Sequence, residues 1–394
     1  MRIKTIMTAC LAVPALSVLC LLSSCSSEEL PTTEKPSTGP QTLTLNLKPA
    51  GTRAAVYTDP GTTAENTINI VTIGIFDQTA DGTGNYPVKT IQEVTTSSTS
   101  PSITTSQLVA GDKVLVAVNA KAGTFTGVKN AADFKNRTLG IDDALGGGSD
   151  AATTVASSKL PMFGTGTITL KDAATSSYEA NVDVYHMVAK VTLNSLSVNF
   201  SAAGAYKNAT FKPTEVFMSN VPDALDFYPA SSYSTFATYT NLCQGQSDVS
   251  SNFRSYLGTG TDLSAFSAKN TTLSGVTGAA TSNWENTSKI LFLYTMPNNA
   301  TTPTRLVIKG LFAADGTSAV PVYYPVNINY NSADGSAADG GTVKQVYPNM
   351  NYIVNVTIQG KGSSDPTVPI DPESATANIT VKDFTSANQS NVFN

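Results

Sequence analysis

The sequence predicts a mainly β protein made of two tandem antiparallel β-sandwich domains, with one short helix in the first. Charged residues are 13 % of the chain and hydrophobic residues 41 %, so Ser, Thr, Asn and Gly supply most of the polarity, which suits pleated extracellular structure. Short runs with a two-residue hydrophobic period recur, whereas helical periodicity occurs once. The chain has 394 residues, enough for about two ordinary domains once a leader is removed.

Residues 1–24 are predicted to be a lipoprotein signal peptide. Arg2 and Lys4 give a positive start, roughly 17 largely apolar residues follow, and Leu22-Ser23-Ser24-Cys25 closes the run like a lipobox, with Cys25 acylated. The alternatives are a buried N-terminal helix or one membrane span interrupted by Pro14, but the apolar run is short for a span. We therefore expect an exported bacterial lipoprotein whose precursor is tethered to the outer membrane.

The segment after the lipobox contains a tether and then a strand. Residues 26–40 are polar, Pro-rich and without periodicity, which is typical of a flexible linker. The run 42–48 then alternates, which places Leu43, Leu45 and Leu47 on one face of a strand.

Further strands and one helix are expected along the rest of the chain. The strands are predicted at 68–76, 112–119, 290–294, 305–311, 323–330, 352–358 and 377–381, with 112–119 apolar on both faces. The helix is predicted within 130–145, and the region 220–285 is rich in loops. In the strand 186–200 the apolar positions change from odd to even, so Asn194-Ser195 should mark a bulge or turn. The domain boundary is placed near this strand, giving domains 54–190 and 191–394.

Charge and cysteine content limit the possible partners and disulfide bonds. The formal charge is −5 and no Lys/Arg cluster is present, which argues against a nucleic-acid partner. Of the four cysteines, Cys10 and Cys20 lie in the leader and Cys25 would carry lipid. Cys243 therefore cannot form an internal disulfide, and we expect it to be a small buried residue.

No catalytic constellation is apparent. His186 is the single histidine and lies in an apolar strand context, so we expect a structural role. No serine lies in a G-x-S-x-G motif. A Cys/His metal site is excluded because His186 and Cys243 are too few ligands. Asp142 and Asp143 are expected to be solvated surface. We predict no enzyme, no cofactor and no metal site.

Two other sets of side chains have weak functional interpretations. Asp77, Asp81 and Asp112 are possible calcium ligands by residue type, but no loop has the calcium-binding pattern. Aromatic residues in and near the 220–285 loops offer faces for sugar stacking, although core or interface packing is the default. These aromatic residues are Tyr228, Tyr233, Phe236 and Trp284.

Several segments, taken in order, resemble the FimA-type fimbrillins, the major subunits of type V pili in Bacteroidia. After the lipobox comes Gly51-Thr52-Arg53-Ala54-Ala55, which resembles their arginine-specific prepilin cleavage site. The remaining matching segments are VLVAVNA (114–120), FGTGTITL (163–170), HMVAKVTLNSLSV (186–198), YYPVNINYN (323–331), YPNMNYIVNVTIQGKGSSDPTVPI (347–370) and ITVKDFTSANQ (379–389). The 323–394 block is the most specific part.

The resemblance implies two tandem transthyretin-like sandwich domains and a route of assembly. Cleavage between Arg53 and Ala54 by an outer-membrane-associated, arginine-specific protease would remove residues 25–53 as a propeptide, together with the lipid and the strand of Leu43, Leu45 and Leu47. The vacated groove would have unpaired strand edges that a strand of a neighbouring subunit can fill.

By resemblance, the donor is the last segment of the chain, about 375–394, where Ala377, Ile379 and Val381 alternate. The terminal motif has Phe384 where many relatives have Trp, and we expect this change to alter groove packing without changing function. The contact is head-to-tail and does not close, so it would generate a filament.

The leading hypothesis is therefore a structural pilus subunit on the cell surface that supports adhesion and biofilm formation. Its expected partners are other copies of the chain, accessory pilus subunits and host or bacterial surface ligands. One alternative is an anchor or accessory subunit that keeps the lipid on Cys25. Another is a monomeric glycan-binding surface lipoprotein that uses the 220–285 loops. A surface hydrolase is the weakest hypothesis.

Overall fold

The computed structural model describes residues 39–49, 62–227, 237–246, 252–260, 263, 273–274, 283–285, 291–368 and 375–383. Several predicted features lie outside this part of the chain: Cys25, Arg53, Ala54, Tyr228, Tyr233, Phe236 and Phe384. Within it, no helix is both long enough and apolar enough to cross a membrane.

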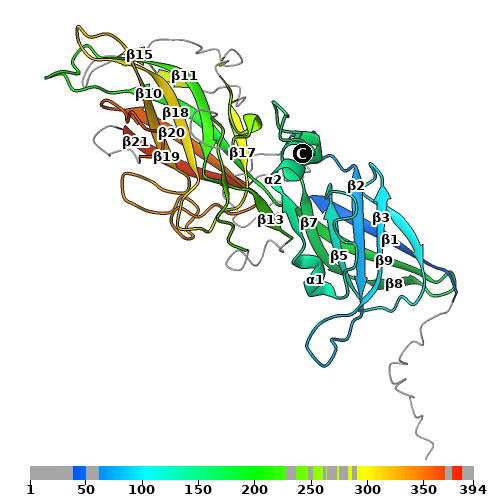
Figure 1. Cartoon of the computed structure of the whole chain (residues 1–394). Helices are drawn as coiled ribbons and strands as arrows, with labels where there is room; N and C mark the ends of the chain where they lie inside the picture. The colour runs from blue at the N-terminus through cyan, green and yellow to red at the C-terminus, as the bar shows by residue number, and fades with distance from the viewer. Residues whose placement is uncertain are drawn as a thin grey trace, which may run out of the picture. The chain divides into compact units, whose positions relative to one another are not determined.

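The first sheet has eight strands and follows the order β3-β2-β5-β7-β9-β1-β4, with β8 paired to β9 (Figure 1). Its strands are β1 (Gln41–Pro49), β2 (Ile70–Phe76), β3 (Val88–Thr95), β4 (Ser102–Thr105), β5 (Lys113–Val118), β7 (Met162–Thr167), β8 (Thr169–Asp172) and β9 (Ser177–His186). All its ladders are antiparallel except β1–β9, which is parallel.

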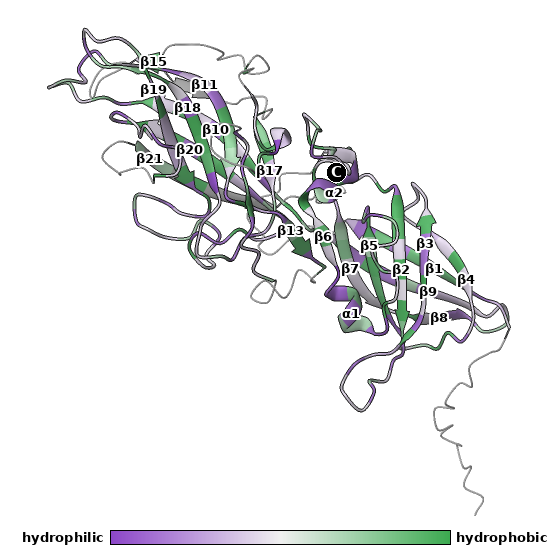
Figure 2. Cartoon of the chain, in the orientation of Figure 1, coloured by the Kyte–Doolittle hydropathy of each residue, from purple (hydrophilic) through white to green (hydrophobic). Residues whose placement is uncertain are grey.

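The centre of this sheet is buried on both faces. Val114 and Val116 of β5 point into a cluster that also contains the leucines of β1, whereas Leu115 and Ala117 point into a second cluster. The neighbouring strand β2 is also buried on both faces, and Figure 2 shows that it is largely hydrophobic. The two-sided apolar pattern predicted for 112–119 is therefore confirmed, because a strand with covered faces has no need of polar alternation.

The later strands form a five-stranded and a four-stranded sheet. The five-stranded sheet contains β10 (Ala189–Val198), β16 (Asn283–Glu285), β17 (Phe292–Thr295), β20 (Met350–Ile358) and β21 (Ala375–Asp383), with β10–β20 parallel. The four-stranded sheet contains β11 (Thr210–Ser219), β15 (Leu273–Ser274), β18 (Arg305–Ala313) and β19 (Val320–Asn327). The ladders are mainly antiparallel, as expected, and the exceptions are the parallel ladders β1–β9 and β10–β20.

The predicted bulge at Asn194-Ser195 is confirmed. The β10–β20 register shifts between Leu193 and Ser195. The side chains of Asn194 and Ser195 both donate to Asn355 Oδ1, at 2.7 and 2.8 Å, and so hold the irregularity in place. Because of the extra residue, Leu193 and Leu196 are both buried although they fall on positions of opposite parity.

The helix expected within 130–145 is wrong in its extent, because two short helices occupy this region. They are α1 (Ala131–Lys135) and α2 (Ile141–Ala144), separated by β6 (Thr138–Gly140). The side chain of Asn130 caps α1 by accepting from the Asp133 N–H at 2.8 Å. Strand β6 pairs with β13 (Ala224–Asp226), a partner more than 80 residues later in the chain, so local periodicity could not indicate it.

The remaining short elements are β12 (Val221–Pro222), which pairs with β14 (Leu242–Cys243), and the 3-10 turns η1 (Ser157–Lys159) and η4 (Ser255–Leu257). The boundary predicted between residues 190 and 191 falls at the start of β10. One apolar cluster contains residues from both sides of that position, such as Phe163 and Phe227, whose ring centroids are 6.1 Å apart.

Candidate functional site

Strand β1 is an interior strand of its sheet although it lies at the start of the described chain. One edge pairs in parallel with β9, from Thr42 opposite Ser177 to Pro49 opposite Val184. The other edge pairs antiparallel with β4 over residues 41–44. Beyond β4 the same edge continues through Leu45 N–H to Pro101 O at 2.9 Å and through Leu47 N–H to Thr99 O at 2.8 Å. Both edges of β1 are thus hydrogen-bonded to other parts of the chain.

The alternation predicted for β1 is present in the structure. Leu43 and Leu45 are completely buried, Leu47 is 4 % exposed, and all three belong to the cluster formed with β2, β5 and β9. The opposite face carries Thr42, which is exposed, and Asn46, whose amide donates to Asn181 Oδ1 at 3.2 Å. The strand therefore fills an apolar groove between β4 and β9 with one face and presents polar side chains on the other.

A buried polar side chain stands at the beginning of this apolar row. Gln41 is 1 % exposed, its Oε1 accepts from the Leu108 N–H at 2.6 Å, and its Nε2 donates to Leu108 O at 3.2 Å. The same Nε2 lies 3.3 Å from the hydroxyl of Tyr178 on β9. The sequence analysis did not identify Gln41, because its partner at 108 is far along the chain.

The segment that follows the predicted cleavage site is fixed to the strands by Glu65. Its carboxylate is buried and accepts from Lys190 Nζ at 3.0 Å, from the hydroxyl of Tyr294 and from the Thr62 N–H. Burial alone would raise the pKa of Glu65, but the Lys190 ammonium and these hydrogen bonds outweigh it and hold the pKa below its usual value. Glu65 thus anchors the chain at 62–67 independently of β1.

His186 also contacts this segment. Its side chain is fully buried at the end of β9, and its Nε2 lies 2.9 Å from Glu65 O. Burial lowers the pKa of His186 to about 4, so the imidazole is neutral at physiological pH. This position agrees with the structural role expected for the residue.

The predicted donor strand lies in its own chain. Strand β21 pairs antiparallel with β20 from Ala375 opposite Ile358 to Asp383 opposite Met350, and this ladder includes Val381. Ala377 is 9 % exposed and Ile379 is 2 % exposed. The side toward residues 331–332 is also bonded: Ser332 N–H donates to Ala377 O at 3.1 Å, and Ile379 N–H donates to Asn331 Oδ1 at 2.7 Å.

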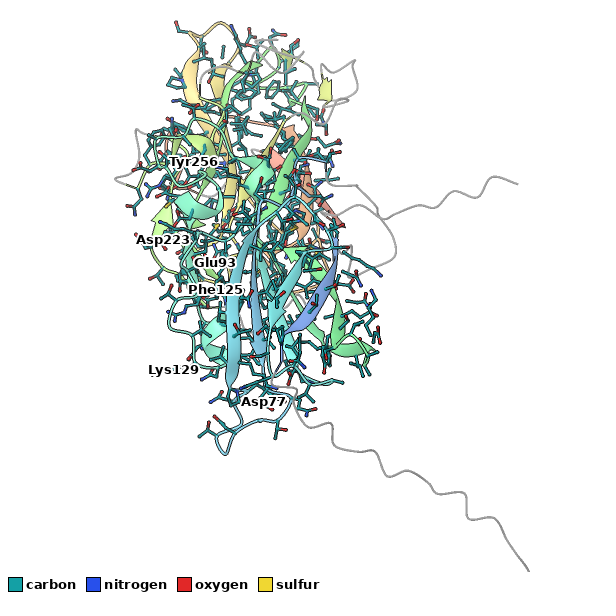
Figure 3. All side chains as sticks on the ribbon, turned by 90° about the vertical axis from the view of Figure 1, so that its right-hand side faces the viewer. Asp77, Glu93, Phe125, Lys129, Asp223 and Tyr256 are labelled. Atoms are coloured by element: carbon teal, nitrogen blue, oxygen red, sulfur yellow. The ribbon has the colours of Figure 1, made fainter. Side chains whose placement is uncertain are left out.

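Among the described residues, no group of three or more His, Cys, Asp or Glu side chains is arranged to hold a metal ion. Asp112 is fully buried, and its carboxylate oxygens both lie 2.8 Å from Lys89 Nζ, so an ammonium neutralises it. Asp77 also pairs with Lys89, with 3.8 Å between Oδ2 and Nζ, so a lysine ammonium occupies the place between these two possible calcium ligands. Figure 3 shows Glu93 away from Asp77, toward the other end of the β2–β3 ladder. Cys243 is buried, and burial raises the pKa of its thiol to about 11.

The expectation that Asp142 and Asp143 are freely solvated is wrong. Asp142 is half-buried and accepts from Arg254 Nε at 2.6 Å and from the Tyr256 hydroxyl at 2.5 Å. Asp143 forms an ion pair with Lys121 at 3.2 Å. The partners of Asp142 lie more than 100 residues later in the sequence, and the carboxylate joins α2 to η4.

The fold resembles that of several solved structures over most of the chain. It is similar to the crystal structure of a fimbrilin (FimA) from Porphyromonas gingivalis, with a TM-score of 0.56 and 14 % identity, covering 89 % of this chain and 99 % of that one. A candidate cell adhesion protein from Bacteroides eggerthii matches with a TM-score of 0.57 and 21 % identity, over 88 % and 97 % of the two chains. A further candidate cell adhesion protein, from Parabacteroides distasonis, matches with a TM-score of 0.57 and 12 % identity, covering 89 % of this chain and 99 % of that one.

A family model described as the major fimbrial subunit protein (FimA) matches residues 41–202, a range that begins at the first residue of β1. This match agrees with the family that the sequence resembles, and it covers less than half of the chain. A search of curated proteins finds no match.

Proposed function

We propose that the chain is a fimbrial subunit made as a lipoprotein precursor, cut after Arg53 and polymerised by donor-strand exchange. The observation that carries the proposal is the position of β1. It is paired on both edges and buried on one face, yet Arg53 follows it by only four residues. A cut after Arg53 would leave β1 attached to the lipid on Cys25 and held to the rest of the chain by non-covalent contacts alone.

Loss of β1 would expose both polar and apolar groups. The facing edges of β9 and β4 would lose their hydrogen-bond partners, and such edges are templates for another strand. The cavity left by Leu43, Leu45 and Leu47 would also be exposed, and burying a leucine side chain contributes about 1.5–3 kcal/mol. A vacated groove would therefore favour the entry of an amphipathic strand from a second copy.

The donor that we propose is the C-terminal segment, 375–394, with Ala377, Ile379 and Val381 facing the groove and Phe384 in the motif that follows them. In the isolated chain β21 is stored on β20, so it would have to leave β20 and the hydrogen bonds of Asn331 and Ser332 before donation. Because the donor of each subunit would fill the groove of the next, assembly would continue as a filament.

The proposal includes two tandem transthyretin-like sandwich domains, 54–190 and 191–394, as the repeating unit of the filament. Accessory subunits and ligands on host or bacterial surfaces would be its further partners. An anchor or accessory subunit that keeps the lipid on Cys25 is the alternative, and it differs in the N-terminus of the mature protein.

The purified full chain, treated with an arginine-specific protease and followed by electron microscopy, tests the proposal. We expect filaments from the wild type and from a Lys48→Ala control, in which an exposed basic residue near the site is removed. We expect none from Arg53→Ala, which should stay uncut, or from a chain lacking residues 375–394, which should be cut but remain monomeric. Filaments from either of these two variants would contradict the proposal.

A further inference from the structure

The start of β1 contains a polar binding site inside an otherwise apolar groove. Three groups make this site: the N–H of Leu108, the C=O of Leu108 and the hydroxyl of Tyr178. We call them the Gln41 socket, because the Gln41 carboxamide contacts all three. Both Gln41 and Leu108 are 1 % exposed, and Tyr178 is 6 % exposed, so bulk water has little access to the socket.

The chemistry of the socket favours a carboxamide. Leu108 presents a donor and an acceptor to the same side chain, and a carboxamide has both an oxygen that accepts and an N–H that donates. A carboxylate cannot donate to Leu108 O, and an apolar side chain can serve neither group. A buried peptide group that loses its hydrogen-bond partner costs more than the bond itself contributes, so either replacement is penalised.

The C-terminal strand does not offer this side chain at the corresponding positions. In β1 the buried row is glutamine followed by three leucines at intervals of two. In the C-terminal segment the alternating apolar row starts at Ala375 and ends at Val381. The residue two positions before this row is Glu373, and the residue two positions after it is Asp383. In either strand direction a carboxylate would therefore meet the socket.

The apolar rows also differ in size. The C-terminal row includes Ala375 and Ala377 where β1 has leucines, so it would fill the groove less completely. Both differences act in the same direction, toward a preference for β1.

We infer that the Gln41 socket is a specificity site that makes the groove prefer its own β1 over the C-terminal strand of a second copy. This inference rests on the proposed strand exchange. Its consequence is that a nicked subunit keeps β1 until the released propeptide is carried away, so a donor strand alone displaces it poorly. The socket thereby opposes premature polymerisation of precursors that meet during export.

A peptide-displacement experiment tests the inference without relying on cleavage at Arg53. A foreign protease site is placed between residues 50 and 61 of the full chain, so that β1 is held non-covalently after the cut. Fluorescent peptides with the sequence of residues 41–49 then compete for the groove, and anisotropy gives their affinities. The comparison peptides carry Gln41→Leu or Gln41→Glu, with Thr42→Val as the matched control on the exposed face.

We expect the wild-type and Thr42→Val peptides to bind equally and the two Gln41 variants to bind at least about tenfold more weakly. A peptide of residues 371–394 should also bind at least about tenfold more weakly than the 41–49 peptide. Equal or tighter binding by the Gln41→Leu peptide, or by the 371–394 peptide, would overturn the inference.

Together with the filament assay of the proposed function, the peptide experiment separates this inference from strand exchange. A preserved glutamine preference in a protein that never polymerises would contradict strand exchange but leave the socket intact. Normal polymerisation with no glutamine preference would contradict the socket and leave strand exchange intact. In the uncut chain, Gln41→Leu should also speed amide hydrogen exchange in residues 42–47 by about tenfold, and unchanged exchange would count against the socket.

Discussion

Replacing Leu45 with alanine should weaken the hold on β1 in the precursor and have no effect on the assembled filament. Leu45 is completely buried in the cluster shared with β2, β5 and β9. Leu→Ala substitutions at such sites cost about 2–5 kcal/mol, and the flanking Leu43 and Leu47 limit how far the groove can collapse around the cavity. A cost of about 3 kcal/mol corresponds to roughly a hundredfold shift in the equilibrium for β1 opening.

Hydrogen exchange monitored by mass spectrometry measures this opening directly. In the uncut chain, the amides of Leu45 and Leu47, which are bonded to Pro101 O and Thr99 O, should exchange about a hundredfold faster in Leu45→Ala than in the wild type. The matched control is Thr42→Ala on the exposed face of β1, for which a change within about 0.5 kcal/mol is expected.

The filament provides the second half of this prediction. If β1 leaves with the propeptide, filaments grown from Leu45→Ala should disassemble in denaturant at the wild-type midpoint. Filaments that are destabilised as much as the precursor would show that β1 remains in the polymer, which would refute the removable-strand hypothesis. Unchanged exchange in the precursor would instead refute the assignment of Leu45 to the core of the groove.

Three further predictions concern the rest of the chain. His186 is buried and neutral, with a pKa of about 4 against an ordinary 6.5, so below pH 6.5 the unfolded chain binds a proton that the folded chain does not. Its contribution should lower the stability by up to about 3 kcal/mol as the pH drops from 6.5 to 4, and pH-dependent denaturation should find a shallower slope in His186→Gln. A Cβ on Gly164 of β7 would lie 2.3 Å from Asp183 O, so Gly164→Ala should lower the free energy of unfolding by about 1–3 kcal/mol, whereas Gly82→Ala, with open space around it, should not. Cys243 should resist iodoacetamide in the native chain and react after unfolding in guanidinium; rapid native labelling would contradict its burial.

Features with a local cause could be predicted from the sequence. The period of two in β1 required one face of leucines to be buried, and the two-sided apolar run of β5 required cover on both faces. The change of parity near Asn194-Ser195 required a bulge, because a strand has only two faces.

Features that depend on distant partners could not be predicted. The split between α1 and α2 arises because β6 meets β13, and the hold on Asp142 arises because Arg254 approaches it. The importance of Gln41 appears only when Leu108 is placed beside it. In each case the role of the residue depends on a partner that is distant in the sequence, so the residue's own segment gives no sign of it.

The N-terminal sequence of the protein isolated from surface filaments tests the removable-strand hypothesis most directly. We predict that it begins at Ala54, with residues 25–53 and the lipid absent. A mature protein that begins at acylated Cys25 would keep β1 in its groove, and that result would contradict donor-strand exchange at this site and favour a lipid-retaining anchor.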